Sequence, residues 1–160
     1  MEDSGQSDDR TPLYLDDLHV GQRFTSGTYQ IDEAQIVAFA RQFDPQPFHL
    51  DAQTAAPTFF KGLVASGWHT AAVSMRLFVE GGRPLAGGLI GAGAEIRWPN
   101  PTRPGAVLHV VSEVLEVKPS RSHRDRGLVT IRNTTIDQHG TVVQSAVCQM
   151  VVPRRSPQPE

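Results

Sequence analysis

The chain has 160 residues, with 15 basic and 17 acidic side chains and a single cysteine, Cys148. This length suits one domain with a core of its own. The even charge balance argues against a nucleic-acid or membrane partner, and one cysteine excludes a disulfide framework or a multi-cysteine metal site. The apolar stretches are shorter than a membrane span and the acidic N-terminus lacks the order of a signal peptide, so we expect a cytoplasmic protein.

Polar residues dominate both ends of the chain, where acidic side chains fill the beginning and prolines with arginines fill the end. Such segments cannot bury enough apolar surface to become ordered. We therefore expect a disordered N-terminal tail over residues 1–11, one domain over residues 12–152 and a disordered C-terminal tail over residues 153–160. No internal repeat or linker-like break divides the central part.

The domain is expected to begin with a strand over Gln22–Ile31, which is rich in Phe, Thr, Tyr and Ile. A helix should follow from Asp32, a good N-cap residue, and it should end at Asp44 because Pro45 comes next. Apolar residues recur at helical spacing and define the face that would be buried: Ile36, Phe39, Ala40 and Phe43.

A second helix is the most apolar element of the sequence. Ser66 is a candidate N-cap, the run Trp68–Val79 is apolar on nearly every face, and Gly81 with Gly82 should end the helix. A helix that is hydrophobic most of the way round is expected to be surrounded by protein.

From residue 89 onward the period of the apolar pattern changes to two, which predicts strands. Short turns between them imply antiparallel neighbours. The simplest fold that buries one apolar helix with such strands is an α+β hot-dog domain, a curled antiparallel sheet of about five strands around a central helix. The expected strands after the helix are Leu89–Trp98, Ala106–Lys118, Leu128–Asp137 and Thr141–Val152.

A carboxylate and an imidazole, Asp44 and His49, stand five residues apart in a segment that also contains Pro45 and Pro47. Prolines restrict both themselves and the residues before them, so we expect this segment to be extended and non-helical, with a preset distance between the two side chains. Acid–base catalysis needs two proton-handling groups at a fixed separation. The sequence therefore predicts an acid–base site here.

The segments Phe39–Asp51, Gly62–Trp68 and Arg97–Gly105 resemble the MaoC-like dehydratases, the family of (R)-specific enoyl-thioester hydratases, and the resemblance extends over residues 12–152. It implies that Asp44 and His49 hold and activate a water molecule. The water would add to the β-carbon of a trans-2-enoyl thioester while the α-carbon gains a proton.

The resemblance also implies that the backbone N–H of Gly67 binds the thioester oxygen. This role has an independent physical basis, because the first N–H groups of a helix are unpaired and carry positive partial charge. Glycine at this position would let a substrate approach the backbone closely.

Four further residues are candidates for substrate binding. Gln46 stands where many family members have Asn, and its longer amide could contact either the water or the loop. Ser66 is more simply explained as the N-cap than as a substrate contact. Trp68 and His69 follow the glycine where smaller or apolar residues are common. They could narrow the acyl pocket or add a polar contact, or they could belong to the core.

The expected partner is an acyl thioester of coenzyme A or of an acyl carrier protein, with no cofactor and no metal. Arg97 and Arg103 could pair with coenzyme A phosphates, although exposed arginines usually pair with nothing in particular. We also expect a homodimer or an assembly built from dimers, because a sheet wrapped on one helix leaves edges open.

Other functions remain open at this point. A hot-dog thioesterase generally has an acidic residue on or next to the central helix, whereas Trp68–Val79 contains none. A serine hydrolase of Ser66, His49 and Asp44 lacks the Gly-x-Ser-x-Gly elbow. A metal site of Asp44, His49 and His69 lacks a known ligand pattern. A non-catalytic thioester-binding subunit would not need to retain both Asp44 and His49.

Overall fold

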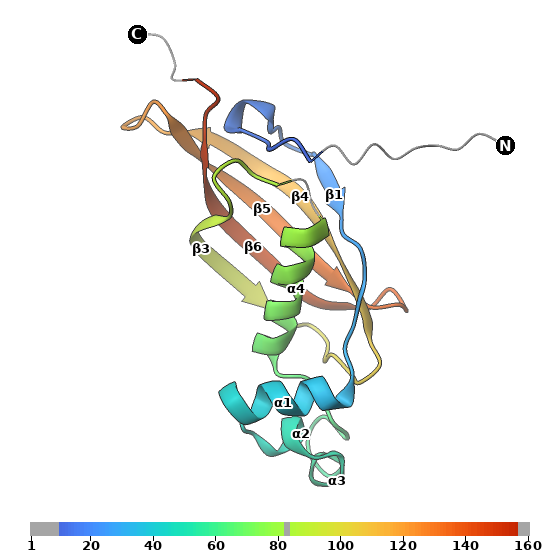
Figure 1. Cartoon of the computed structure of the whole chain (residues 1–160). Helices are drawn as coiled ribbons and strands as arrows, with labels where there is room; N and C mark the ends of the chain where they lie inside the picture. The colour runs from blue at the N-terminus through green and yellow to red at the C-terminus, as the bar shows by residue number, and fades with distance from the viewer. Residues whose placement is uncertain (1–9, 82–83, 157–160) are drawn as a thin grey trace, which may run out of the picture.

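One long helix lies across the face of a six-stranded antiparallel sheet in the computed structural model of the chain (Figure 1). The structure describes residues 10–81 and 84–156. The strand order is β1-β4-β5-β6-β3, and β2 also pairs with β4. The elements are a 3-10 turn η1 (Leu15–Asp17), strands β1 (Arg23–Thr25) and β2 (Tyr29–Gln30), helices α1 (Glu33–Phe43), α2 (Pro47–Leu50), α3 (Ala52–Ala55) and α4 (Gly67–Gly81), and strands β3 (Ile90–Arg97), β4 (Val107–Pro119), β5 (Arg126–Ile136) and β6 (Val142–Pro153).

The period-two pattern of the sequence is confirmed in the sheet, where β4 and β5 alternate between more and less buried residues. The expected single first strand is wrong, because it divides into β1 and β2. Ser26 lies at the break, where its N–H donates to the Val110 carbonyl and its Oγ accepts from the Val110 N–H at 2.8 Å. A side chain thus replaces part of the regular backbone pairing, and the sheet has six strands instead of about five.

Helix α1 begins and ends where the sequence predicts. The Asp32 carboxylate accepts from the Gln35 N–H at 2.8 Å, and the Gln35 amide oxygen accepts from the Asp32 N–H at 2.9 Å. Asp44 forms the C-cap before Pro45. The predicted apolar face is only partly buried, since Phe43 is 68% exposed.

Helix α4 is capped as predicted, because Ser66 Oγ accepts from the Trp68 N–H at 3.2 Å. Its inner face contains polar groups that bond to the sheet, and Ser74 Oγ lies 2.6 Å from Thr135 Oγ1. The expectation that protein surrounds this helix is wrong for a single chain. Trp68, Met75 and Val79 form an exposed apolar stripe at helical spacing.

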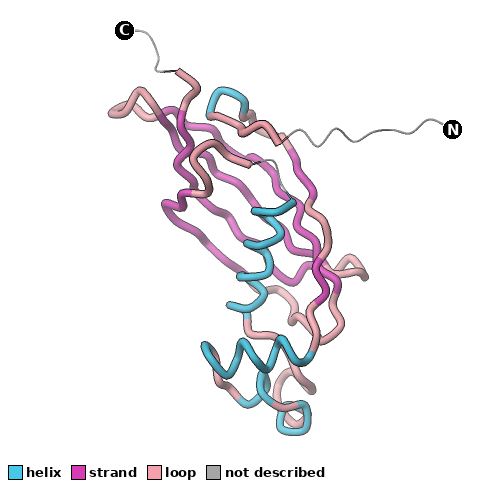
Figure 2. Tube along the Cα trace, in the orientation of Figure 1, coloured by secondary structure: helices cyan, strands magenta, loops and turns pink. Residues whose placement is uncertain are grey.

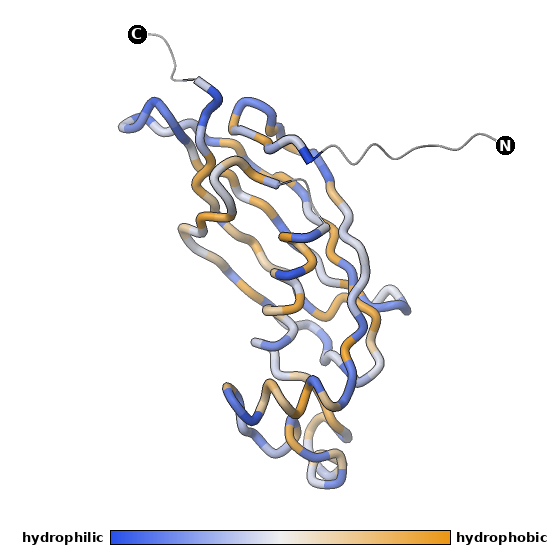
Figure 3. The backbone as a smooth tube through the Cα atoms, in the orientation of Figure 1, coloured by the Kyte–Doolittle hydropathy of each residue, from blue (hydrophilic) through white to orange (hydrophobic). Residues whose placement is uncertain are grey.

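The core fills the space between α4 and the sheet as two groups of buried side chains, one containing Leu77 and the other Phe78. Apolar residues follow the strands and α4, whereas the turns at the ends of the sheet are hydrophilic (Figure 3). Helices α1 to α3 gather at the end where α4 begins, as Figure 2 shows. This arrangement brings the residues after α1 next to the N-terminus of α4.

The chain end extends the domain beyond the predicted boundary at residue 152, because β6 includes Pro153. Arg154 and Arg155 then bond to Asp16 and Asp17 in and around η1. Residues 1–9 and 157–160 of the expected tails, and the expected helix end at Gly82, lie outside the described residues. Within the described part of the chain, no helix is long and apolar enough to cross a membrane.

Candidate active site

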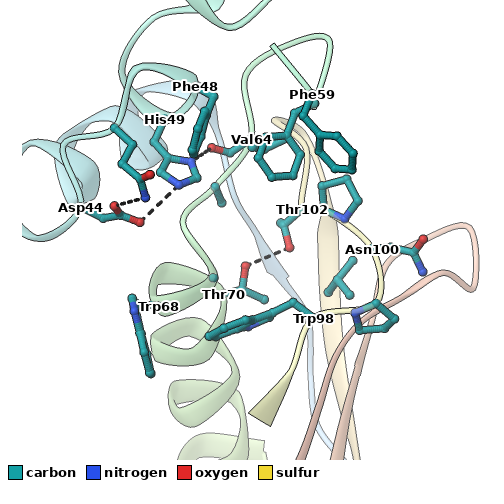
Figure 4. Close-up of a pocket in the computed structure, with 17 residues that line it drawn as sticks. Asp44, Phe48, His49, Phe59, Val64, Trp68, Thr70, Trp98, Asn100 and Thr102 are labelled. Carbon is teal, nitrogen blue, oxygen red and sulfur yellow. Dashed lines mark hydrogen bonds and ion pairs between the residues drawn. The ribbon is translucent and has the colours of Figure 1, made fainter.

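A cavity of about 440 Å³ lies between the α2 end of the molecule and the loop that joins β3 to β4 (Figure 4). Five parts of the chain contribute residues to it: the end of α1 with α2, the segment between α3 and α4, the first turn of α4, the β3–β4 loop and strand β6. The lining residues are Asp44, Gln46, Phe48, His49, Phe59, Phe60, Val64, Ala65, Gly67, Trp68, Thr70, Trp98, Pro99, Asn100, Pro101, Thr102 and Val143.

The structure brings the predicted acid–base pair together at this cavity. His49 Nε2 lies 3.2 Å from Asp44 Oδ2. The predicted extended shape is wrong for the second half of the segment, because Pro47 begins helix α2 and His49 lies within it. Proline suits the first position of a helix, where its missing N–H is not needed. The short helix buries His49 and turns its ring back toward Asp44.

A backbone carbonyl fixes the tautomer of His49. Its Nδ1 lies 2.7 Å from the carbonyl oxygen of Val64, which can only accept, so Nδ1 carries the proton. In neutral His49 the free lone pair is therefore on Nε2, the nitrogen beside Asp44. A base with its lone pair next to a carboxylate is suited to take a proton from a water that both groups hold.

The environment of Asp44 keeps it ionised. Burial acts to raise its pKa, but hydrogen bonds from Ser66 and Gln46 outweigh it, joined by the charge and the Nε2–H of His49 when that ring is protonated, so the pKa of Asp44 lies below the ordinary value. Gln46 Nε2 donates to Asp44 Oδ1 at 2.7 Å. The longer amide at this position thus contacts the carboxylate itself. Asp44 Oδ2 is the oxygen that faces His49.

Gly67 is the first residue of α4 and borders the cavity. Its N–H has no partner among the described residues, as expected for the first turn of a helix. A Cβ at this position would lie 2.7 Å from Cε2 of Trp98. The structure therefore gives a second reason for glycine here, which is the packing of an indole ring against the start of α4.

The other predicted contacts divide into two groups. Gln46 and Trp68 border the cavity, although Trp68 is 60% exposed and stands at its outer edge. Ser66 is fully buried behind the lining, where its hydroxyl caps α4 and bonds to Asp44.

His69 does not border the cavity. It points toward α1, where its ring stacks on Phe39 with centroids 4.6 Å apart. Its buried Nδ1 has no hydrogen-bond partner among the described residues, and burial lowers its pKa. No cluster of three or more potential metal ligands occurs in residues 10–81 and 84–156.

Several residues of the cavity are missed by reasoning from the sequence. Trp98 forms a wall, and its Nε1–H donates to the buried Oε1 of Gln144 at 2.9 Å. Thr70 and Thr102 meet at 2.9 Å inside the cavity (Figure 4). Strand ends and loop residues carry no spacing that identifies them as neighbours. In the sequence, Trp98 precedes Pro99 and lies near Pro101, and stiff neighbours of this kind are the local sign that its ring is held in one place.

Fold and site together define a hot-dog domain with a carboxylate–imidazole pair in its cavity. The chain belongs to the MaoC-like dehydratases, since the model of the MaoC like domain family matches residues 18–152. A relative from Bacillus subtilis strain 168, the uncharacterized protein YdeM, is 32% identical over 145 residues, which is 89% of this chain and 100% of YdeM.

Two solved structures extend the comparison. The MaoC-like dehydratase from Rhodospirillum rubrum is 55% identical with a TM-score of 0.88, covering 90% of this chain and 99% of that one. The R-hydratase PhaJ1 from Pseudomonas aeruginosa is 28% identical with a TM-score of 0.69, covering 93% of this chain and 95% of that one. The predicted family and fold class are thus confirmed, and the comparisons support a hydratase or dehydratase role in general.

Proposed function

We propose that the protein catalyses the reversible hydration of a trans-2-enoyl thioester, an acyl-coenzyme A, to the 3-hydroxyacyl thioester. The observation that carries this proposal is the Asp44–His49 pair, with its 3.2 Å separation, at a cavity that Gly67 also borders. The dehydratase family and the similarity to an R-hydratase support the same type of reaction.

In this proposal a water molecule donates hydrogen bonds to Asp44 Oδ2 and His49 Nε2. As the water oxygen attacks the β-carbon, the pair takes its proton, and the α-carbon receives a proton from the pair. The net change is the addition of OH to one carbon and H to the other. The lowered pKa of Asp44 keeps the carboxylate charged, which suits an acceptor that orients water.

Negative charge develops on the thioester oxygen when the β-carbon is attacked. The Gly67 N–H is the group that would stabilise it, because it stands unpaired at the positive end of a 15-residue helix. Trp98 packs against Gly67, which lines the cavity, and this contact supports a fixed position for the proposed donor. Gln46 and Trp68 are proposed as substrate-side contacts, whereas Ser66 supports Asp44 from behind.

The test uses crotonyl-coenzyme A. Hydration removes the conjugated enoyl absorbance without releasing thiol, whereas a thioesterase would release free thiol. We expect Asp44→Asn and His49→Gln each to reduce hydration by about 10² to 10⁴-fold. Gln42→Leu, on the exposed side of α1, is the matched control. Full hydration by both variants would refute the mechanism, and thiol release by the wild type would replace it with hydrolysis.

We also propose that the active form is a homodimer. Strand β3 is an outer strand of the sheet with nearly all its residues exposed, so one row of its backbone groups has no neighbouring strand within residues 10–81 and 84–156. The exposed stripe on α4 adds apolar surface that a second chain would bury.

A further inference from the structure

Two buried threonine hydroxyls line the cavity and take no part in the proposed activation of water. Thr70, from α4, and Thr102, from the β3–β4 loop, both border the cavity, and they are only 2% and 3% exposed. Their Oγ1 atoms lie 2.9 Å apart, and Figure 4 shows the two side chains turned toward each other. Most of the other lining side chains are aromatic or aliphatic. Buried hydroxyls in such a wall need hydrogen-bond partners that the apolar side chains do not supply.

The bond between the two threonines leaves hydrogen-bonding capacity on Thr102 unused. Each hydroxyl has one proton, and the Thr70–Thr102 bond uses one of the two. If Thr102 donates, Thr70 can donate its own proton to the Ser66 carbonyl, at a long 3.4 Å, and the lone pairs of Thr102 stay free. If Thr70 donates, the proton of Thr102 has no acceptor within the described residues. A hydroxyl group in the cavity, which both donates and accepts, satisfies Thr102 in either arrangement.

The place of Thr70 on α4 relates these hydroxyls to the proposed thioester site. Thr70 follows Gly67 by three residues, so the two lie on one face of the helix and about 4.5 Å apart along its axis. Three carbon–carbon bonds separate the thioester carbon from C4 of an acyl chain, which is a similar reach. With the thioester oxygen at the Gly67 N–H, a chain that runs along α4 into the cavity brings C4 to the level of the threonines.

The charge of the lining distinguishes a neutral substituent on C4 from an anionic one. Among the described residues that line the cavity, none is lysine or arginine, whereas the lowered pKa of Asp44 keeps its carboxylate charged. A carboxylate on the acyl chain would be buried here without a cation, which is unfavourable. A methyl group would cover Thr102 and leave its bonding capacity unused. A hydroxyl avoids both penalties.

We infer that Thr70 and Thr102 bind a hydroxyl group on the acyl chain, so that the preferred substrate is a trans-2-enoyl thioester with a hydroxyl on C4. This inference rests on the proposed function, because the proposed contact at Gly67 sets where C4 lies. Thr102 makes the direct contact, and Thr70 orients the Thr102 hydroxyl. Addition of water to this substrate yields the 3,4-dihydroxyacyl thioester.

The kinetic test compares three thioesters of coenzyme A that differ only at C4: crotonyl, 4-hydroxycrotonyl and fumaryl. The wild type should give the highest kcat/KM with the 4-hydroxycrotonyl substrate and the lowest with the fumaryl substrate. Because the hydroxyl also changes the intrinsic reactivity of the double bond, the comparison between variants carries the test.

Thr102→Val keeps the shape of the side chain and removes its hydroxyl. It should lower kcat/KM for 4-hydroxycrotonyl-coenzyme A by about 5- to 10-fold more than kcat/KM for crotonyl-coenzyme A, the scale of one lost hydrogen bond. Thr102→Ser retains a hydroxyl and should retain the preference. Thr134→Val, at a partly exposed position of β5 that does not border the cavity, is the matched control and should behave like the wild type.

A binding measurement keeps the inference separate from catalysis. The saturated analogues 4-hydroxybutyryl-coenzyme A and butyryl-coenzyme A have no double bond to hydrate. In a calorimetric titration the wild type should bind the hydroxy analogue about 5- to 10-fold more tightly, and Thr102→Val should bind the two equally. If no enoyl substrate is hydrated but this difference is found, the proposed function fails and the hydroxyl site stands. Equal binding of the two analogues by the wild type, or equal losses with the crotonyl and 4-hydroxycrotonyl substrates in Thr102→Val, would overturn the inference.

Discussion

The indole of Trp98 packs directly on the backbone of Gly67, so that a Cβ added at Gly67 would fall 2.7 Å from Trp98 Cε2. Gln144 holds the ring from the other side by accepting the Nε1–H at 2.9 Å. Gly67, at the start of α4, is thus held by Trp98 from the β3–β4 loop, and Trp98 is held in turn by Gln144 from β6. This contact gives a direct way to test the role of Gly67.

We expect Gly67→Ala to reduce hydration by about 100-fold, because the new Cβ displaces either the ring or the first turn of α4, and small misplacements of reacting groups cost activity on that scale. The double variant Gly67→Ala/Trp98→Val should recover part of the loss, since the colliding ring is removed. Steady-state kinetics of both variants and of Trp98→Val form a complete cycle. A double variant no better than Gly67→Ala would show that the collision is not the cause.

Gln46 should influence the pH below which kcat/KM for hydration falls. Its hydrogen bond favours the charged form of Asp44 and helps to lower that pKa. Gln46→Leu removes the bond, so the Asp44 pKa should rise and the acid limb of kcat/KM should move to higher pH. The matched control is again Gln42→Leu, which should leave the limb in place. A limb that stays fixed in Gln46→Leu would mean that another group controls it.

His69 should make the fold sensitive to mild acid. Burial lowers its pKa from the ordinary 6.5, so between the folded and unfolded pKa values the unfolded chain binds more protons. The free energy of unfolding should therefore fall as pH drops below about 6.5, down to the folded pKa.

Urea unfolding at neutral and mildly acidic pH measures this effect. The pH-dependent loss should be smaller in His69→Leu than in the wild type, while His123→Leu, at an exposed loop position, should behave like the wild type. Identical pH dependence in wild type and His69→Leu would contradict the assignment.

The exposed stripe on α4 should contribute to self-association. The wild type is expected to sediment as a dimer of the 17.5 kDa chain, because burial of Met75 and Val79 removes apolar surface from water. Met75→Lys/Val79→Lys should shift the population toward monomer. Val20→Lys, at an exposed apolar residue outside the stripe, should not. A wild-type protein that sediments only as a monomer would refute the proposed dimer.

Local patterns in the sequence predict most of the fold. The cap at Asp32, the stop before Pro45 and the alternation of β4 depend on neighbours within a few residues, so they are visible in the chain itself. The break at Ser26 is not, because it depends on a bond to Val110 that forms only when the sheet assembles. The exposed stripe was missed since the sequence does not tell which apolar face lacks a partner.

The residues of the candidate site also fall into two groups: those that local sequence reveals and those that only the folded chain brings together. Asp44 and His49 lie close in sequence, and their short separation made the pair visible. Trp98 and Gln144 are brought to Gly67 from distant strands, and no local spacing marks them. His69 was grouped with the site because it follows Gly67, but successive helical residues point to different sides, and its ring faces Phe39.

Val64 is bonded to α2 twice, since its carbonyl accepts from His49 Nδ1 at 2.7 Å and its N–H donates to the Phe48 carbonyl at 3.1 Å. The chain is thus closed into a loop just after the turn that carries Phe59. These two bonds tie the imidazole to the backbone on the far side of the turn, so we expect residues 56–62 to tolerate substitution without a change in the orientation of His49.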